Sequence, residues 1–162
     1  MYSRAEQLEA LSLLVDHESA MADLYWAYAP RFPDRTVLFR GLAMAEQTHV
    51  RWIRDFAARV QQGAMQVNPR RFRPAAFQTS MDLIREQIRL TGEPEMTLLT
   101  ALSVAHDLEE ALIERRYYEV VEGDQPEMLD LLRRIEVESS QHRAVLRRAW
   151  EEERGLAPAG HR

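Results

Sequence analysis

Carboxylates and histidines stand at helical spacing in the middle of four long, otherwise apolar segments of the chain. Glu46 and His49 are three residues apart in LAMAEQTHVRW, a spacing that puts both side chains on one face of a helix. Glu18, Glu109 and His142 hold comparable places in the other three segments. Because a carboxylate and an imidazole on one helix face can bind the same metal ion, the pattern indicates a metal site.

The composition restricts the ligands of such a site to oxygen and nitrogen atoms. The 162 residues include no cysteine, which excludes disulfides, thiolate zinc sites, iron–sulfur clusters and cysteine nucleophiles. Carboxylates gathered in an apolar layer repel one another and lose their hydration, and a divalent cation offsets both costs. Carboxylate and imidazole ligands without thiolate suit iron, manganese or zinc.

The charge and hydropathy of the chain argue against several other partners. A hydrophobic fraction of 46%, a charged fraction of 29% and a net charge of −5 describe a globular, mildly acidic protein, which has no long-range attraction for nucleic acid or anionic membranes. No apolar run approaches the length of a transmembrane helix, and the first residues lack the apolar core of a signal peptide. We therefore expect a cytoplasmic protein with no nucleic-acid or membrane partner.

Four long helices are predicted to position these residues. Ser3 and Glu6 have the spacing of a helix-capping box, and Pro126 is of a type favoured in a first helical turn. The predicted helices run from Ser3 to about Pro30, from near Asp34 to before Gly63, from after Pro94 to Gly123, and from Pro126 to before Gly155. They form one domain, residues 1–155, which is followed by a flexible C-terminal tail, residues 156–162.

The lengths of the connections predict the topology. The first two helices, and the last two, are joined by only a few residues, so each pair is expected to be an antiparallel hairpin. The connector between the hairpins is long, and its stretch FQTSMDLIREQIRL is predicted to form a short helix. The predicted fold is therefore all-α: a ferritin-like four-helix bundle of two antiparallel helical hairpins joined by a long crossover that contains a short helix.

The polar residues are expected to lie at one level of this bundle. Each helix carries an apolar seam at spacings of three and four residues, with a polar interruption near its middle. Each interruption lies about fourteen residues from its turn, or roughly 20 Å along the helix. The hairpins also resemble each other: ALSLLVDHESA and ALSVAHDLEEA align Glu18 with Glu109, and AEQTHVR and ESSQHRA align His49 with His142. A duplicated hairpin predicts a site with approximate twofold symmetry.

With these residues in place, the chain resembles the rubrerythrin branch of the ferritin-like di-iron carboxylate proteins, and in particular the erythrins, which lack a rubredoxin domain. The residues that carry the resemblance are Glu18 and Tyr25, the Glu46–His49 pair, Glu109 and Tyr117, and His142. In that family each hairpin supplies a Glu from its first helix and a Glu-x-x-His pair from its second, and together they bind two iron ions. Because the chain has no cysteine for a rubredoxin iron, the resemblance implies an external electron donor.

One position departs from the family pattern. Ser139 stands where the resemblance leads us to expect a glutamate three residues before His142. Glu138, four residues before His142, is the first candidate to compensate, and His106 on the predicted seam is the second. The predicted metal ligands are therefore Glu18, Glu46, His49, Glu109 and His142, with Glu138 as the sixth. Two iron ions are expected from the resemblance, and a single ion, manganese or zinc is the alternative.

Two kinds of function follow from this prediction. The first is a metal-binding protein that oxidises Fe(II) or reduces peroxide, with metal ions, peroxide or dioxygen, and an electron donor as its partners. The second is a non-catalytic helical bundle whose degenerate or single-metal site serves assembly or partner binding. Aromatic residues away from the seams, Trp26, Trp52 and Trp150, are candidates for a homodimer surface. His17, beside Glu18 but off the seam, is expected to be exposed.

Overall fold

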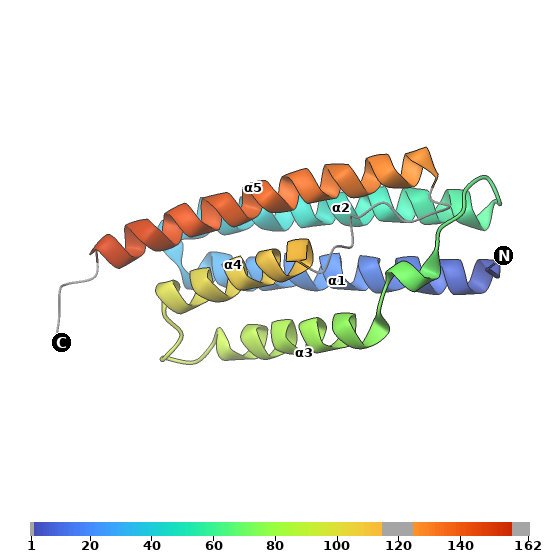
Figure 1. Ribbon diagram of the computed structural model, residues 1–162. Helices are drawn as coiled ribbons and strands as arrows, with labels where there is room; N and C mark the ends of the chain where they lie inside the picture. The colour runs from blue at the N-terminus through green and yellow to red at the C-terminus, as the bar shows by residue number, and fades with distance from the viewer. Residues whose placement is uncertain (1, 115–124, 157–162) are drawn as a thin grey trace.

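The computed structural model describes residues 2–114 and 125–156 of the chain. Within these residues the protein is all-helical and contains no strand, which confirms the predicted all-α class. Figure 1 shows long helices lying side by side along a common axis. Tyr117, the turn before Pro126 and residues 157–162 of the predicted tail lie outside the described residues.

The first hairpin consists of α1 (Arg4–Arg31) and α2 (Thr36–Gln61), joined by the short 3₁₀ turn Pro33–Arg35. The capping box that begins α1 is present: Ser3 Oγ accepts a hydrogen bond from Glu6 N–H at 3.2 Å, and Glu6 Oε2 accepts one from Ser3 N–H at 2.7 Å. α2 ends just before Gly63, whose φ of 78° suits glycine. Both ends of this hairpin lie close to their predicted positions.

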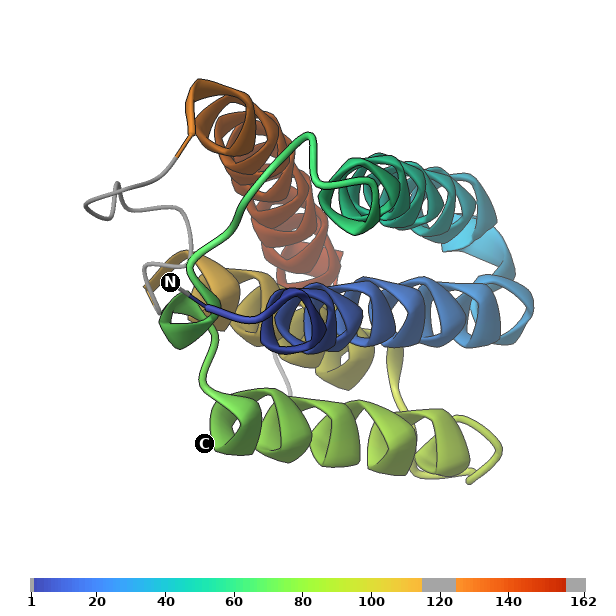
Figure 2. The same cartoon turned by 90° about the vertical axis from the view of Figure 1, so that its right-hand side faces the viewer.

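The second hairpin consists of α4 (Leu98–Glu114) and α5 (Pro126–Leu156). The crossover between the hairpins contains a 3₁₀ turn (Pro69–Arg71) and the helix α3 (Pro74–Leu90). In Figure 1, α3 runs back along the molecule, so that α2 and α4 run in the same direction while each hairpin is antiparallel. Figure 2 shows α3 as an outer helix beside the other four.

The apolar core is divided into two clusters at opposite ends of the bundle. The first includes Leu14 of α1, Ile53 of α2 and Ile135 of α5. The second resumes further along each helix, with residues such as Met21, Ala43, Leu108 and Leu146. On α1, α2 and α5 the two clusters are separated by roughly two to three turns of helix. Those turns contain the polar interruptions, and this separation confirms that they share one layer of the bundle.

Candidate metal centre

Five of the predicted ligands come together in the polar layer between the two apolar clusters. Glu18 comes from α1, Glu46 and His49 from α2, Glu109 from α4 and His142 from α5. The first four are at most 1% exposed and His142 is 7% exposed. Such burial of three carboxylates is costly unless each of them meets positive charge.

His49 lies at the centre of the first group of ligands. Its Nδ1 is 3.1 Å from Glu18 Oε2 and 2.9 Å from Glu46 Oε2, and it donates to these carboxylates. Glu18, Glu46 and His49 each offer one atom to a set whose members all lie within 4.8 Å of one another. One ion can therefore be reached by all three side chains, which form the first trio.

A second trio is formed by Glu46, Glu109 and His142, whose ligand atoms also lie within 4.8 Å of one another. His142 Nδ1 is 2.9 Å from Glu46 Oε1 and 3.3 Å from Glu109 Oε1. Glu46 thus belongs to both trios, turning one carboxylate oxygen towards each histidine. The two imidazole rings stack with centroids 5.8 Å apart, so the two trios are neighbours in one continuous site.

Several atoms of the site converge without making hydrogen bonds. Among the described residues, Glu18 Oε1, Glu46 Oε1, Glu109 Oε2 and His142 Nδ1 are buried and have no hydrogen-bond partner. His142 Nδ1 is close to two carboxylate oxygens, yet neither contact has the angles of a hydrogen bond. Buried polar atoms are rarely left without a partner. Convergent orphan oxygens and an imidazole nitrogen are what a cation site requires, and these residues therefore fit a metal ion.

Without an ion, protons on the two histidines provide the positive charge of the layer. Burial opposes the charged form of His49, but its hydrogen bonds to Glu18 and Glu46 prevail and raise the pKa of the imidazole to about 11. Burial likewise opposes charge on His142, and Glu109 and Glu46 raise its pKa to about 10. Burial raises the pKa of the Glu18 carboxyl. For Glu46, burial and Glu109 oppose ionisation, but contacts with both histidines leave its pKa lowered.

The metal-free protein is therefore expected to lose stability in alkaline solution. The pKa values of His49 and His142 in the folded state, about 11 and about 10, lie above the ordinary value of 6.5. Their contribution is fully present below pH 6.5 and is lost as the pH rises through these folded values, at a rate of at most about 1.4 kcal/mol per pH unit for each histidine. Urea unfolding of the metal-free protein between about pH 7 and pH 11 measures this loss. A free energy of unfolding that stays constant over this range contradicts it.

Tyr25 supports the second trio from α1. Its side chain is fully buried, and its hydroxyl donates to Glu109 Oε1 at 2.7 Å. Burial and the nearby Glu109 carboxylate raise the pKa of this hydroxyl well above its ordinary value, so it keeps its proton and remains a donor. This contact orients Glu109.

Glu138 and Ser139 occupy different places in the layer. Ser139 is buried, with 1% of its surface exposed, whereas the Glu138 side chain is 36% exposed. Glu138 Oε2 lies 2.9 Å from His49 Nε2, on the side of the ring opposite the first trio. Glu138 belongs to neither trio. A direct ligand role for Glu138 remains a prediction, and the structure places the residue behind His49.

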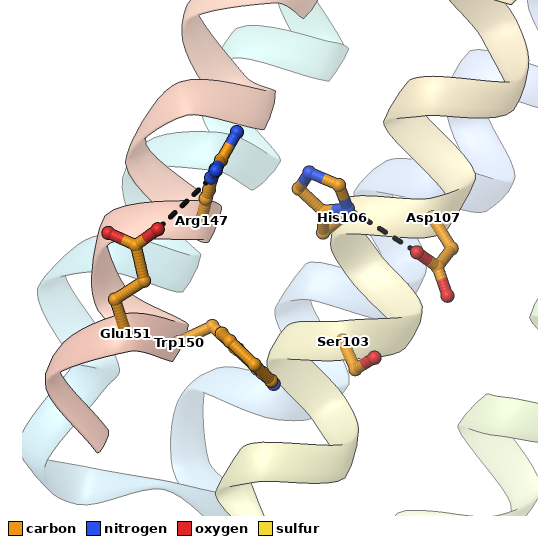
Figure 3. Close-up of a pocket in the computed structure, with 6 residues that line it drawn as sticks. All are labelled: Ser103, His106, Asp107, Arg147, Trp150 and Glu151. Carbon is orange, nitrogen blue, oxygen red and sulfur yellow. Dashed lines mark hydrogen bonds and ion pairs between the residues drawn. The ribbon is translucent and has the colours of Figure 1, made fainter. Parts of the chain in front are cut away.

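His106 does not reach the site and cannot compensate for Ser139. Its ring faces a surface depression of about 280 Å³ between α4 and α5, and its Nδ1 lies 3.3 Å from Asp107 Oδ1. Figure 3 shows this pair across the depression from Arg147, Trp150 and Glu151. The predicted seam position of His106 was wrong because the buried face of α4 runs through Ala105 and Leu108 instead.

His17 was also misplaced by the seam prediction. It is 1% exposed rather than solvated, and its Nε2 lies 2.8 Å from Ser80 Oγ of α3. Its ring also meets Phe77 edge-on, with centroids 5.6 Å apart. The crossover helix α3 covers this face of α1. The prediction considered only the four bundle helices, so it left this face exposed.

Comparisons with known protein families, with curated proteins and with solved structures find no match for this chain. In the described part of the chain, no helix combines the length and the apolarity needed to cross a lipid bilayer. The buried Glu/His layer itself carries the chemical information in this structure. Its geometry shows two groups of side chains that could each hold a metal ion.

Proposed function

We propose that this protein is a ferritin-like di-metal protein that binds two iron ions between its helical hairpins and uses them to oxidise Fe(II) or reduce peroxide. The observation that carries the proposal is Glu46, a buried carboxylate with one oxygen towards each of two Glu/His trios. A carboxylate shared in this way suits a pair of ions better than one ion. The two hairpins with a crossover helix agree with the bundle in which such sites occur.

Charge balance supports two ions. Four carboxylates, those of Glu18, Glu46, Glu109 and Glu138, border the two imidazoles. Two divalent ions neutralise all four carboxylates when both histidines are neutral ligands, whereas one ion leaves one of the three buried carboxylates uncompensated. In the metal-free protein the two histidines hold protons instead. The site thus exchanges protons for metal, as sites with titratable ligands do.

The donor atoms support iron, manganese or zinc as occupants. Iron bound there supplies one-electron chemistry towards dioxygen or peroxide. The residues of this chain hold and orient the site: Tyr25 fixes Glu109 through its hydroxyl, and the apolar clusters on either side exclude water from the layer. No cysteine is present to hold a second redox centre, so the proposal includes an electron donor outside this chain.

Anaerobic loading with Fe(II) tests the proposal. We expect about two irons per chain by metal analysis and a change in the optical spectrum when peroxide is added. Loading with Zn(II) is the matched control, because zinc fills the same ligands without redox chemistry. If the chain binds no iron, or one redox-inert ion, the second candidate applies: a non-catalytic bundle with a degenerate site. Ser139, in place of a glutamate, is the observation that favours this candidate.

Ser139→Glu should strengthen the second trio. Position 139 is buried one helical turn before His142, so a carboxylate there faces the ion held by Glu109 and His142. We expect the second ion to bind roughly tenfold more tightly, because added ligand charge raises the affinity of such sites. The same change should destabilise the metal-free protein, because it adds a buried charge.

Isothermal titration and urea unfolding measure these two opposite effects of Ser139→Glu. Ser140→Glu is the matched control, since it adds the same charge at the neighbouring, partly exposed position. Equal affinities for the second ion in Ser139→Glu and the wild type contradict the idea that position 139 limits the site.

A further inference from the structure

Glu138 lies outside both trios but contacts the ring at the centre of the first one. Its Oε2 is 2.9 Å from His49 Nε2, while His49 Nδ1 faces Glu18 and Glu46 at 3.1 and 2.9 Å. The two nitrogens of an imidazole point away from each other. A carboxylate that accepts from Nε2 therefore stands behind the ring and does not share an ion held at Nδ1.

The His49 ring depends on this contact for its orientation. The ring is completely buried, so its Nε2–H needs an acceptor within the protein. Its flat sides face other rings: His142, with centroids 5.8 Å apart, and Trp52, at 5.6 Å. These contacts limit tilting of the ring but do not decide which nitrogen carries the proton. When an ion replaces the proton on Nδ1, Glu138 decides this, because a carboxylate that accepts from Nε2–H keeps the remaining proton there and leaves the Nδ1 lone pair to the ion.

Glu138 can hold this position at modest cost because it remains partly hydrated. Its side chain is 36% exposed and borders a surface depression of about 310 Å³ that is also lined by Arg133 and Arg134. Arg134 lies over the other neighbour of His49, with its guanidinium 4.0 Å from the centre of the Trp52 ring. Two partly exposed residues of α5, Glu138 and Arg134, thus cover His49 on its Nε2 side, directly or through Trp52.

His142 has no corresponding contact. Its Nδ1 faces Glu46 and Glu109, and among the described residues no carboxylate lies within ion-pair distance of its Nε2. The two imidazoles are therefore not equivalent, although the repeated hairpins align them. The position that matches Glu138 in the first hairpin is Ala45, so this feature belongs to one half of the site only.

We propose that Glu138 is a positioning residue for His49, which it holds with Nδ1 towards Glu18 and Glu46, and that it thereby makes the first trio the tighter of the two ion sites. The inference rests on the proposed function, because it concerns ions bound at this layer. A positioning role and a ligand role for Glu138 predict different effects on metal binding when its carboxylate is removed. Losing a ligand reduces the number of bound ions, whereas losing a positioning residue weakens one of them.

Titration of the metal-free protein with Co(II) tests this distinction. In the wild type we expect two ions to bind in two phases. Glu138→Ala should weaken the tighter phase by roughly 10–100-fold, the usual effect of removing a partner of a metal-bound histidine. It should still bind two ions and keep the wild-type Co(II) absorption bands. Glu138→Gln should restore most of the affinity, because its amide oxygen can accept the same hydrogen bond. Glu136→Ala, which removes a carboxylate from the same helix, is the matched control.

Nitrogen NMR of the imidazoles in the Zn(II)-loaded protein gives a second measurement. We expect the proton of His49 to reside on Nε2 in the wild type and to exchange faster with water in Glu138→Ala. A drop to one bound ion in Glu138→Ala overturns the inference by making Glu138 a ligand. An unchanged Co(II) affinity in Glu138→Ala also overturns the inference, because Glu138 would then have no role in metal binding. A wild type that binds no ion overturns the proposed function itself, and this inference with it.

Discussion

Glu46→Gln is expected to remove both bound ions, whereas Glu18→Gln and Glu109→Gln should each remove one. Glu46 offers an oxygen to each trio, while Glu18 and Glu109 each belong to a single trio. Changes behind a metal ligand already weaken binding by roughly 10–100-fold, so loss of the ligand itself should exceed 100-fold at every ion it contacts. Equilibrium dialysis against Zn(II), followed by metal analysis, counts the ions retained by each variant.

The control for these variants is Glu110→Gln. Glu110 is next to Glu109 but pairs with Arg143 at 2.6 Å, with about a third of its side chain exposed, so its loss should leave two ions bound. Glutamine is nearly the same size as glutamate, and circular dichroism will show whether each variant keeps its helices. If Glu46→Gln still binds one ion as tightly as the wild type, Glu46 is not shared and the two trios are not parts of one site.

Filling one of the two ion sites is also expected to raise the melting temperature by about 8–16 °C. An ion at 1,000 times its dissociation constant adds about 4 kcal/mol to the free energy of unfolding, and in a domain of this size each kcal/mol corresponds to about 2–4 °C. Thermal unfolding with and without Zn(II) measures the shift, and a chelator should reverse it. Mg²⁺ is the control, because it prefers oxygen ligands and retains its water. An equal shift in the wild type and in Glu46→Gln means that zinc acts elsewhere.

Much of the fold could be predicted because local signals agreed with the hairpin topology. The capping box at Ser3, the glycine at 63 and the proline at 126 mark helix ends that the structure shows within a residue or two. The start of α4 was less well marked: the helix begins at Leu98 rather than directly after Pro94. The stretch after Pro94 has no strong capping signal, so its boundary depends on packing.

The level of the site was predictable for a different reason. In antiparallel hairpins, residues equally far from the turn lie side by side, so spacing alone brought Glu18 to Glu46 and Glu109 to Ser139, with His142 about one helical turn further along α5. The distance of a residue from the turn does not determine how each helix is rotated about its own axis. α4 is apolar on a broad face, so the predicted seam that placed Glu109 correctly also included His106, which lies at a surface depression instead. The burial of His17 depended on α3, a neighbour that hairpin geometry does not supply.

The sharing of Glu46 could not be read from the sequence. Its Glu-x-x-His spacing links it to His49 alone, and the second contact, with His142, is made across helices. The missing partner at position 139 leaves Glu46 as the only carboxylate common to both trios. Because the second hairpin has Ser139 where a glutamate was expected, Glu46 alone connects the two trios.

The division of the apolar interior also affects how the molecule opens. On α1, α2 and α5 the layer between the two apolar clusters contributes charges rather than close-packed hydrocarbon, whereas the clusters approach each other at Ala20 and along α3. Regions with separate cores tend to behave as separate cooperative units in local unfolding. Without metal, the two ends of the bundle are connected mainly by the helices that run through both clusters. Ions bound by side chains of α1, α2, α4 and α5 would cross-link these four helices near their middles. Local unfolding of either end of the bundle would then also disturb the ion site.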